Sequence, residues 1–314
     1  MRLLHTTKLT LHTFFDKDVP KYAILSHRWD EEEVIFQDLQ SGRGPDMPGF
    51  AKIQGCCAQA RSDGWEYAWI DSCCIDKSSS AELSEAINSM FKWYEKAMVC
   101  YVYLSDVDGK KAIPEQLEVS AWFTRGWTLQ ELLAPETVVF FDRYWRDIGT
   151  KSTLEDLISQ ITRIRDIFAW QECCVAEKMS WASRRGTTRV EDEAYCLMGI
   201  FDVNMPLLYG EGKKAFQRLQ LEILNSSDDD SLFCWEDHDG FGSMLAVSPA
   251  AFESGYNIRH YPGRDPALSP NVQDPADHPH CPYPTIACSA IFLCMRAHSE
   301  PTLSKYPEKY NFME

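Results

Sequence analysis

The sequence lacks an excess of basic residues. It holds 31 Lys and Arg against 47 Asp and Glu, which gives a formal net charge of −16 and a pI near 4.9. Release of counterions from a phosphate backbone needs a basic surface, so general binding of nucleic acid is excluded. The expected partners therefore include no nucleic acid.

Long apolar runs are also missing. No stretch approaches the roughly 20 apolar residues that cross a bilayer, and the mean hydropathy is −0.33. Residues 1–8 have no apolar segment of the kind that opens a secretory signal. We therefore expect no membrane span, no export and a cytoplasmic location, where the 12 cysteines stay reduced.

Several chemical motifs are absent. The cysteine pairs 56–57, 73–74 and 173–174 are adjacent instead of C-x-x-C, and no G-x-S-x-G elbow occurs. Residues 210–214 (GEGKK) lack the phosphate-loop spacing, so a turn that opens a helix is expected there. Although residues 278–281 hold two His and one Cys, a Pro-rich loop explains them better than a metal site. We expect no metal and no bound cofactor.

What is present predicts an α/β fold. Residues 22–26, 67–70, 98–104 and 137–141 are short, apolar and rich in β-forming side chains, as buried parallel strands are. Helical spacing of apolar residues separates them. This order predicts a mainly parallel sheet of four or five strands within residues 1–145, with helices on both faces and ligands beyond the carboxyl ends of the strands.

The chain then changes character twice. Residues 146–235 show mainly helical periods and predict a helical layer on the sheet. Residues 236–314 hold ten of the sixteen prolines and predict an irregular segment of loops and short strands. The expected organisation is thus 1–145 as the α/β core, 146–235 as a helical extension and 236–314 as a Pro-rich segment.

The first polar cluster follows the first predicted strand. Ser26, His27, Arg28 and Trp29 place a hydroxyl, an imidazole, a guanidinium and an indole at a strand end, where they suit a phosphate or an aromatic ring. The acidic residues 30–33 that follow fit equally well an exposed loop leading into a helix. Asp71, after the second strand, fits either a ribose contact or a turn cap.

A third cluster lies in a short helix expected around residues 127–134. Trp127 and Glu131 stand four residues apart and share a helix face, so an aromatic wall and a carboxylate could border one pocket. The spacing alone fits better a buried Trp127 with a solvated Glu131 paired to Arg125.

The same stretches carry a family resemblance. The chain resembles the fungal heterokaryon-incompatibility (HET) domain over roughly residues 1–235, most specifically in the segments YAILSHRW (22–29), WIDSCCID (69–76), RGWTLQELLAP (125–135) and TTRVEDEAYCLMGIF (187–201). Arg28 and Asp30 depart from the residues that the family more often has there. The resemblance implies a role in non-self recognition and cell death, a homo-oligomer and a partner protein of that pathway.

The HET domain itself is similar to the Toll/interleukin receptor (TIR) fold, which is flavodoxin-like. Some TIR domains cleave NAD at the nicotinamide–ribose bond. By this resemblance Glu131 would be the catalytic carboxylate, NAD the substrate, and Ser26, Arg28, Trp29, Asp71 and Trp127 the residues near the nucleotide. Because one fold hosts enzymes and scaffolds alike, a self-associating module without catalysis is the alternative.

Overall fold

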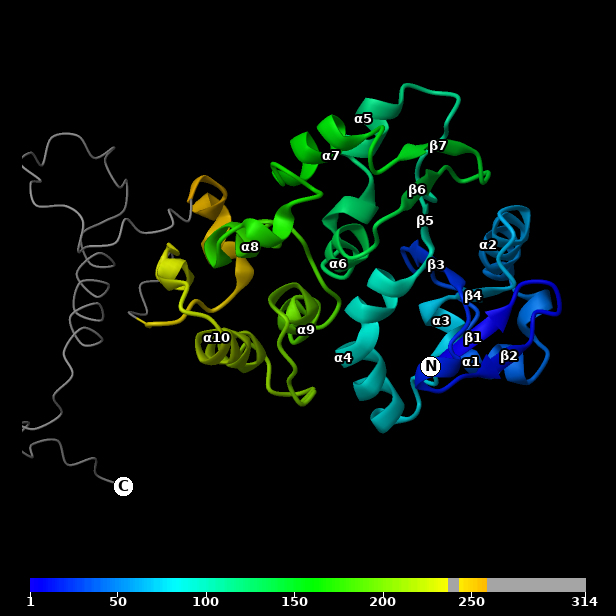
Figure 1. The fold of residues 1–314 in the computed structure, drawn as a ribbon, viewed down its shortest axis with the longest axis horizontal. Helices are drawn as coiled ribbons and strands as arrows, with labels where there is room; N and C mark the ends of the chain where they lie inside the picture. The colour runs from blue at the N-terminus through cyan, green and yellow to red at the C-terminus, as the bar shows by residue number, and fades with distance from the viewer. Residues whose placement is uncertain (237–242, 259–314) are drawn as a thin grey trace, which may run out of the picture. The chain divides into compact units, whose positions relative to one another are not determined.

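A seven-stranded sheet organises the chain (Figure 1). The computed structural model describes residues 1–236 and 243–258, which belong to one compact unit, Met1–His260. The sheet has the order β2-β1-β4-β3-β5-β6-β7. Its strands are β1 (Arg2–His5), β2 (Leu11–Thr13), β3 (Tyr22–His27), β4 (Tyr67–Trp69), β5 (Val99–Tyr103), β6 (Val138–Phe141) and β7 (Asp147–Thr150).

The four strands expected from apolar runs form the parallel centre of the sheet. Strand β3 pairs in parallel with β4 on one side and β5 on the other, and β5 pairs in parallel with β6. The prediction of a mainly parallel α/β sheet is therefore confirmed. Chain order reverses at β3 and β5, since the chain runs from β3 out to β4 and then crosses back to β5. This switch point is where open α/β sheets bind ligands.

The expected strand number was too small. Strands β1 and β2 form an antiparallel hairpin that extends the sheet beyond β4, and β7 extends it antiparallel to β6. These outer strands are three or four residues long and carry mixed polar and apolar side chains. Pairing to a formed edge stabilises them, and no buried apolar run marks them in the sequence.

Helices connect and cover the strands. The α-helices are α1 (Phe36–Gln40), α2 (Phe50–Ser62), α3 (Asp71–Cys74), α4 (Ser80–Lys96), α5 (Ile113–Glu118), α6 (Thr128–Leu133), α7 (Glu155–Thr162), α8 (Val175–Ser180), α9 (Asp192–Tyr195) and α10 (Lys214–Ser226). The 3₁₀ helices are η1 (Asp16–Asp18), η2 (Gly44–Asp46), η3 (Ala121–Thr124), η4 (Trp170–Glu172), η5 (Met198–Phe201), η6 (Asp230–Phe233) and η7 (Pro249–Asn257).

Both faces of the sheet are covered. Figure 1 shows α2 on one side of the strands and α4 and α6 on the other. Alternation along β5 agrees, because the Tyr101 hydroxyl bonds Asp63 at the end of α2, whereas the Cys100 thiol points to the backbone of α6. We call these the α2 face and the α6 face. Ser26 and Ile24 lie on the α6 face, opposite Val102 and Cys100 in the β3–β5 register.

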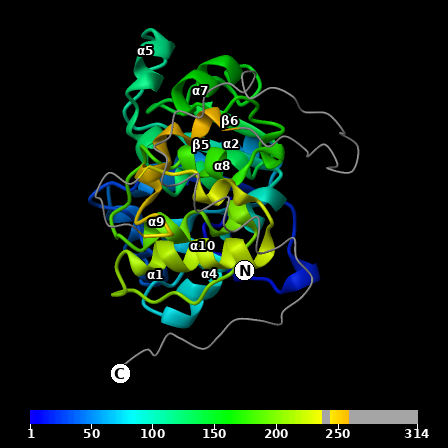
Figure 2. The ribbon, with the colours of Figure 1, turned by 90° about the vertical axis from the view of Figure 1, so that its left-hand side faces the viewer.

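Helices α7 to α10 follow the sheet in the chain, and Figure 2 shows α8, α9 and α10 in front of it. Within the helical periods of residues 146–235, the stretch 190–201 forms no single long helix but the four-residue α9 followed by the 3₁₀ helix η5. Tight packing accounts for the break in the helix, since η5 contacts α4 closely. A Cβ built at Gly199 would stand 2.1 Å from the Cβ of Phe91.

The described residues also bear on the expected membrane spans, cysteines and domain boundaries. None of the described helices is long and apolar enough to cross a membrane. The cysteines of the described residues are free thiols. Within residues 236–314 the structure describes 236 and 243–258, including η7, so the cluster at residues 278–281 lies outside the described residues. The proposed boundaries near 145 and 235 fall inside the unit Met1–His260 and stay predictions.

The Gly199 contact generates a stability prediction. We expect Gly199→Ala to lower the free energy of unfolding by about 1–3 kcal/mol, because the added methyl group overpacks the contact with Phe91. Urea unfolding measures it. Gly186→Ala is the matched control, since a Cβ there meets nothing within 4 Å. Equal stabilities of the two variants would contradict the tight packing of η5 on α4.

Candidate functional site

A buried hydrogen-bonded pair stands at the switch point of the sheet. The Ser26 hydroxyl, at the carboxyl end of β3, donates to Glu131 Oε2 at 2.5 Å, and Trp122 Nε1 donates to the same Ser26 oxygen at 2.8 Å. Ser26 is fully buried and Glu131 is 7% exposed. Strand β3 and helix α6, 105 residues apart in sequence, thus meet through this bond.

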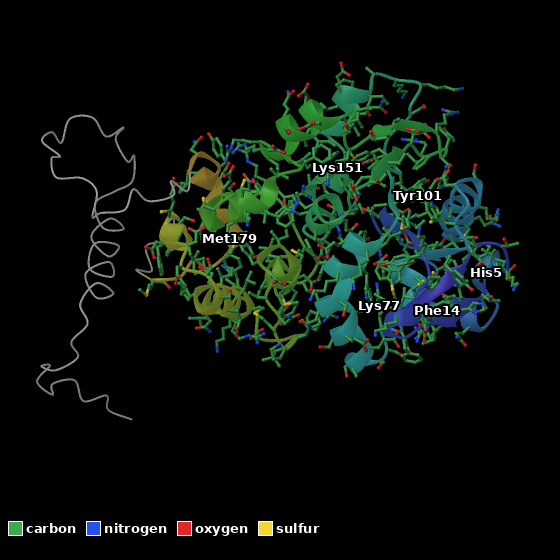
Figure 3. All side chains as sticks on the ribbon, viewed as in Figure 1. His5, Phe14, Lys77, Tyr101, Lys151 and Met179 are labelled. Carbon is green, nitrogen blue, oxygen red and sulfur yellow. The ribbon has the colours of Figure 1, made fainter. Side chains whose placement is uncertain are left out.

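Local structure fixes the position of Glu131. Helix α6 spans only Thr128–Leu133, and all six of its residues are buried. The Thr128 hydroxyl is 2.6 Å from the Trp122 carbonyl and 2.9 Å from that of Arg125, which joins the start of α6 to the preceding 3₁₀ turn. At the other end, Lys151 Nζ donates to the Pro135 carbonyl at 2.9 Å. Figure 3 labels Lys151 beside this helix.

Burial changes the acidity of Glu131. Desolvation raises its pKa to about 8, and the negative charge of Asp71 also raises it, whereas hydrogen bonds with Ser26 and Tyr94 work in the opposite direction. Near neutral pH the carboxyl is therefore largely protonated. A carboxyl group with a pKa near the working pH is typical of catalytic sites, although structural networks produce it too.

A second polar group lies at the end of β4. Trp29 Nε1 donates to Asp71 Oδ2 at 2.9 Å, and Lys77 Nζ lies 3.3 Å from the same oxygen. The Lys77 nitrogen is also 3.5 Å from the centre of the Trp29 ring. Asp71 is the first residue of α3 and makes no capping bond, so the turn-cap interpretation does not describe it.

The α2 face holds a buried histidine of the first polar cluster, with two acidic neighbours. His27 is flanked by Glu33 Oε2 at 3.6 Å and Asp71 Oδ1 at 3.8 Å, and its side chain is 1% exposed. Burial raises the pKa of Glu33, but hydrogen bonds and charges of His27 and Lys52 outweigh it and leave the pKa at about 2. Strand alternation places His27 on the opposite face from Ser26, because the two are consecutive in a strand buried on both faces.

Four of the six predicted site residues form two contacting pairs, and the other two lie apart from them. Ser26 and Glu131 touch each other, Trp29 and Asp71 touch each other, and the charge of Asp71 acts on Glu131. The side chain of Arg28 is exposed. Trp127 lies elsewhere and hydrogen-bonds the carboxyl group of Asp192 in α9. Burial raises the pKa of this carboxyl group. The structure therefore forms two contacting pairs, one at the carboxyl end of β3 and one at the carboxyl end of β4.

The expected pairing of Glu131 with Arg125 is not what the structure has. Glu131 is buried against Ser26 instead of solvated. The GEGKK segment is, as expected, a turn that opens a helix, since α10 begins at Lys214. The backbone amides of Gly210 and Gly212 donate to Glu191 Oε1 at 2.8 and 3.0 Å. These two amides are therefore already hydrogen-bonded to a carboxylate of the chain itself. The described residues hold no group of three or more metal-ligating side chains.

Comparison with known proteins adds the family. Residues 22–115 match the family model described as heterokaryon incompatibility protein (HET). The chain carries a HET domain. Ser26, Arg28, Trp29 and Asp71 lie within the matched residues, and Trp127 and Glu131 lie beyond them.

The HET domain also has a close relative. Over 220 residues it is 50% identical to vegetative incompatibility protein HET-E-1 of Podospora anserina, a match that covers 65% of this chain. The chain spans 16% of the length of that relative. No solved structure matches the chain, so the similarity to the TIR fold stays a prediction.

The raised pKa of Glu131 predicts how stability depends on pH. In the unfolded chain Glu131 loses its proton near 4.5, and in the folded chain near 8. Between these values only the unfolded state gains the charge, so the free energy of unfolding falls by on the order of a few kcal/mol as pH rises through this window.

Glu131→Gln removes this titration. We expect thermal unfolding of this variant, relative to the natural chain, to shift to higher temperature by several degrees more at pH 9 than at pH 5. Glu118→Gln, at an exposed glutamate of α5, is the control. A temperature difference that is the same at both pH values would contradict the raised pKa.

Proposed function

We propose that this HET domain acts in vegetative incompatibility and cell-death signalling, and that it does so by hydrolysing NAD at the nicotinamide–ribose bond. The name of HET-E-1 supports the first part, by relationship. One observation supports the second: a carboxyl group, Glu131, is held by Ser26 inside the fold at the switch point of the sheet. Action in the cytoplasm and as a homo-oligomer belongs to the same proposal.

The chemistry asks one thing of Glu131. As the bond between ribose C1′ and the nicotinamide nitrogen breaks, its electron pair leaves with nicotinamide and positive charge develops on the ribose. A fixed carboxylate stabilises this oxocarbenium-like charge more than the ground state. Water then adds its oxygen to C1′ and releases a proton, which gives ADP-ribose and nicotinamide.

The surroundings suit this task. Trp122 donates to Ser26, and Ser26 in turn donates to Glu131 and holds it in one position, so no reorganisation is needed when charge develops. The apolar neighbours that raise its pKa also strengthen its attraction for a nearby positive charge. Trp29 and Asp71, at the end of the adjacent strands, would contact the rest of the nicotinamide riboside.

A second function is favoured by a different observation. Glu131 is 7% exposed, which leaves little of the carboxyl group to meet a substrate in the described conformation. If the Ser26–Glu131 bond only joins β3 to α6, the domain is a self-associating interaction module of the same pathway. The two functions differ in whether nicotinamide is released.

Nicotinamide release from NAD by concentrated protein tests the proposal. We expect Glu131→Gln and Glu131→Ala each to lose at least about 100-fold in rate, since removing one preorganised electrostatic group costs this much. Glu118→Gln should keep the rate of the natural chain. An unchanged rate in Glu131→Gln would reject the role, and no release under conditions where light scattering shows oligomers would favour the interaction module.

The pH profile provides an independent check. Because the carboxylate is the active form and its pKa in the free protein is about 8, kcat/KM should rise nearly tenfold per pH unit below 8 and level off above it. Initial rates at low NAD between pH 6 and 9.5 measure this. A profile that is flat across the range would mean that ionisation of Glu131 does not limit the reaction.

A further inference from the structure

The face of the Trp29 ring is occupied by a cation from the chain itself. The Lys77 ammonium group lies 3.5 Å from the ring centre, inside the range of a cation–π contact. It also lies 3.3 Å from Asp71 Oδ2, the oxygen that accepts the Trp29 indole N–H. An aromatic face and a carboxylate thus converge on one position, and a positive charge fills it.

These three groups are accessible. The side chain of Lys77 is 33% exposed, that of Asp71 is 24% exposed, and Trp29 is half-buried. Figure 3 labels Lys77 near α4. Lys77 belongs to the turn between α3 and α4, and Trp29 to the loop after β3, so one lysine side chain joins two connecting segments. Its ammonium can leave the ring by rotation about side-chain bonds, without any change in the backbone.

The local charge favours a cation at this position. Acidic residues outnumber basic ones in the loop after β3 and around α3, since Arg28 and Lys77 are the basic residues there and the acidic ones are Asp30, Glu31, Glu32, Glu33, Asp71 and Asp76. Lys52 of α2 pairs with two of these acids, Asp30 and Glu33. His27 lies 3.8 Å from Asp71 Oδ1, the second oxygen of this carboxylate. A phosphate group would meet repulsion here, whereas a positively charged group would not.

We propose that Trp29 and Asp71 form a subsite for a flat, positively charged aromatic ring, and that Lys77 occupies this subsite until such a ring displaces it. The identity of the ligand rests on the proposed function: it is the cationic nicotinamide ring of NAD. The ring would stack on the indole with its charge beside Asp71. Lys77 would then limit affinity, and the neutral ring of NADH would bind less well than that of NAD.

The subsite should distinguish a cationic ring from a neutral ring, and small probe molecules can measure this effect of charge alone. 1-Methylnicotinamide is a cation and nicotinamide is a neutral molecule of nearly the same shape, and neither carries phosphate. Their binding is followed by quenching of tryptophan fluorescence or by calorimetry. Binding needs no cleavage, so the measurement is independent of Glu131 chemistry.

Lys77→Met keeps the length of the side chain and removes the charge. We expect it to bind 1-methylnicotinamide about fivefold more tightly than the natural chain, and nicotinamide with unchanged affinity. Lys77→Arg should restore the affinity of the natural chain. Lys92→Met, at an exposed lysine of α4, is the matched control. Trp29→Leu in the Lys77→Met background should abolish the gain, and Trp29→Phe, which keeps an aromatic face, should retain part of it.

The outcomes separate this proposal from the proposed function. Tighter binding of the cation in Lys77→Met without nicotinamide release from NAD would support the subsite and reject catalysis. Release of nicotinamide together with weaker binding of NAD by Lys77→Met would overturn the subsite and leave catalysis intact. Equal affinity for the cationic and neutral probes, or no binding of either, would also overturn the subsite.

Discussion

Strand β3 is hydrogen-bonded along both edges and buried on both faces, and the arrangement of the polar groups depends on it. Since successive side chains of a strand point to opposite faces, Ser26 meets Glu131 on the α6 face, and His27 meets Glu33 on the α2 face. The loop that follows places Trp29 at the end of β4. One strand therefore supplies or directs the polar contacts on both sides of the sheet.

Much of the central fold is predictable from the sequence because burial leaves a strong pattern. The apolar run at residues 22–26 becomes a strand buried at every position, and the runs of β4, β5 and β6 pair with it or with one another in parallel as expected. The outer strands leave no such pattern. They pair at the edges of the central strands, so their strand conformation depends on tertiary context more than on their own sequence.

The candidate site is predictable in part, for a related reason. The rule that ligands bind beyond the carboxyl ends of the strands correctly brings Ser26 near Glu131 and Trp29 near Asp71. Trp127 and Glu131 were expected to share one face of a helix whose other side meets solvent. Helix α6 is buried all around, so its neighbours differ from turn to turn, and Trp127 contacts Asp192 while Glu131 contacts Ser26. Lys52 and Trp122 could not be selected, because their importance comes from contacts far away in sequence.

Lys52 has a mechanical consequence. From within α2 it reaches the carbonyl oxygen of Arg28 at 3.0 Å and the carboxylate of Asp30 at 2.8 Å, on the two sides of Trp29. The same ammonium group pairs with the buried carboxylate of Glu33, so Lys52 joins the loop to α2 at three places. A movement of the loop that carries Trp29 would therefore act directly on α2 through this side chain. A molecule bound to the outer surface of α2 would therefore respond to a movement of this loop without contacting the loop itself.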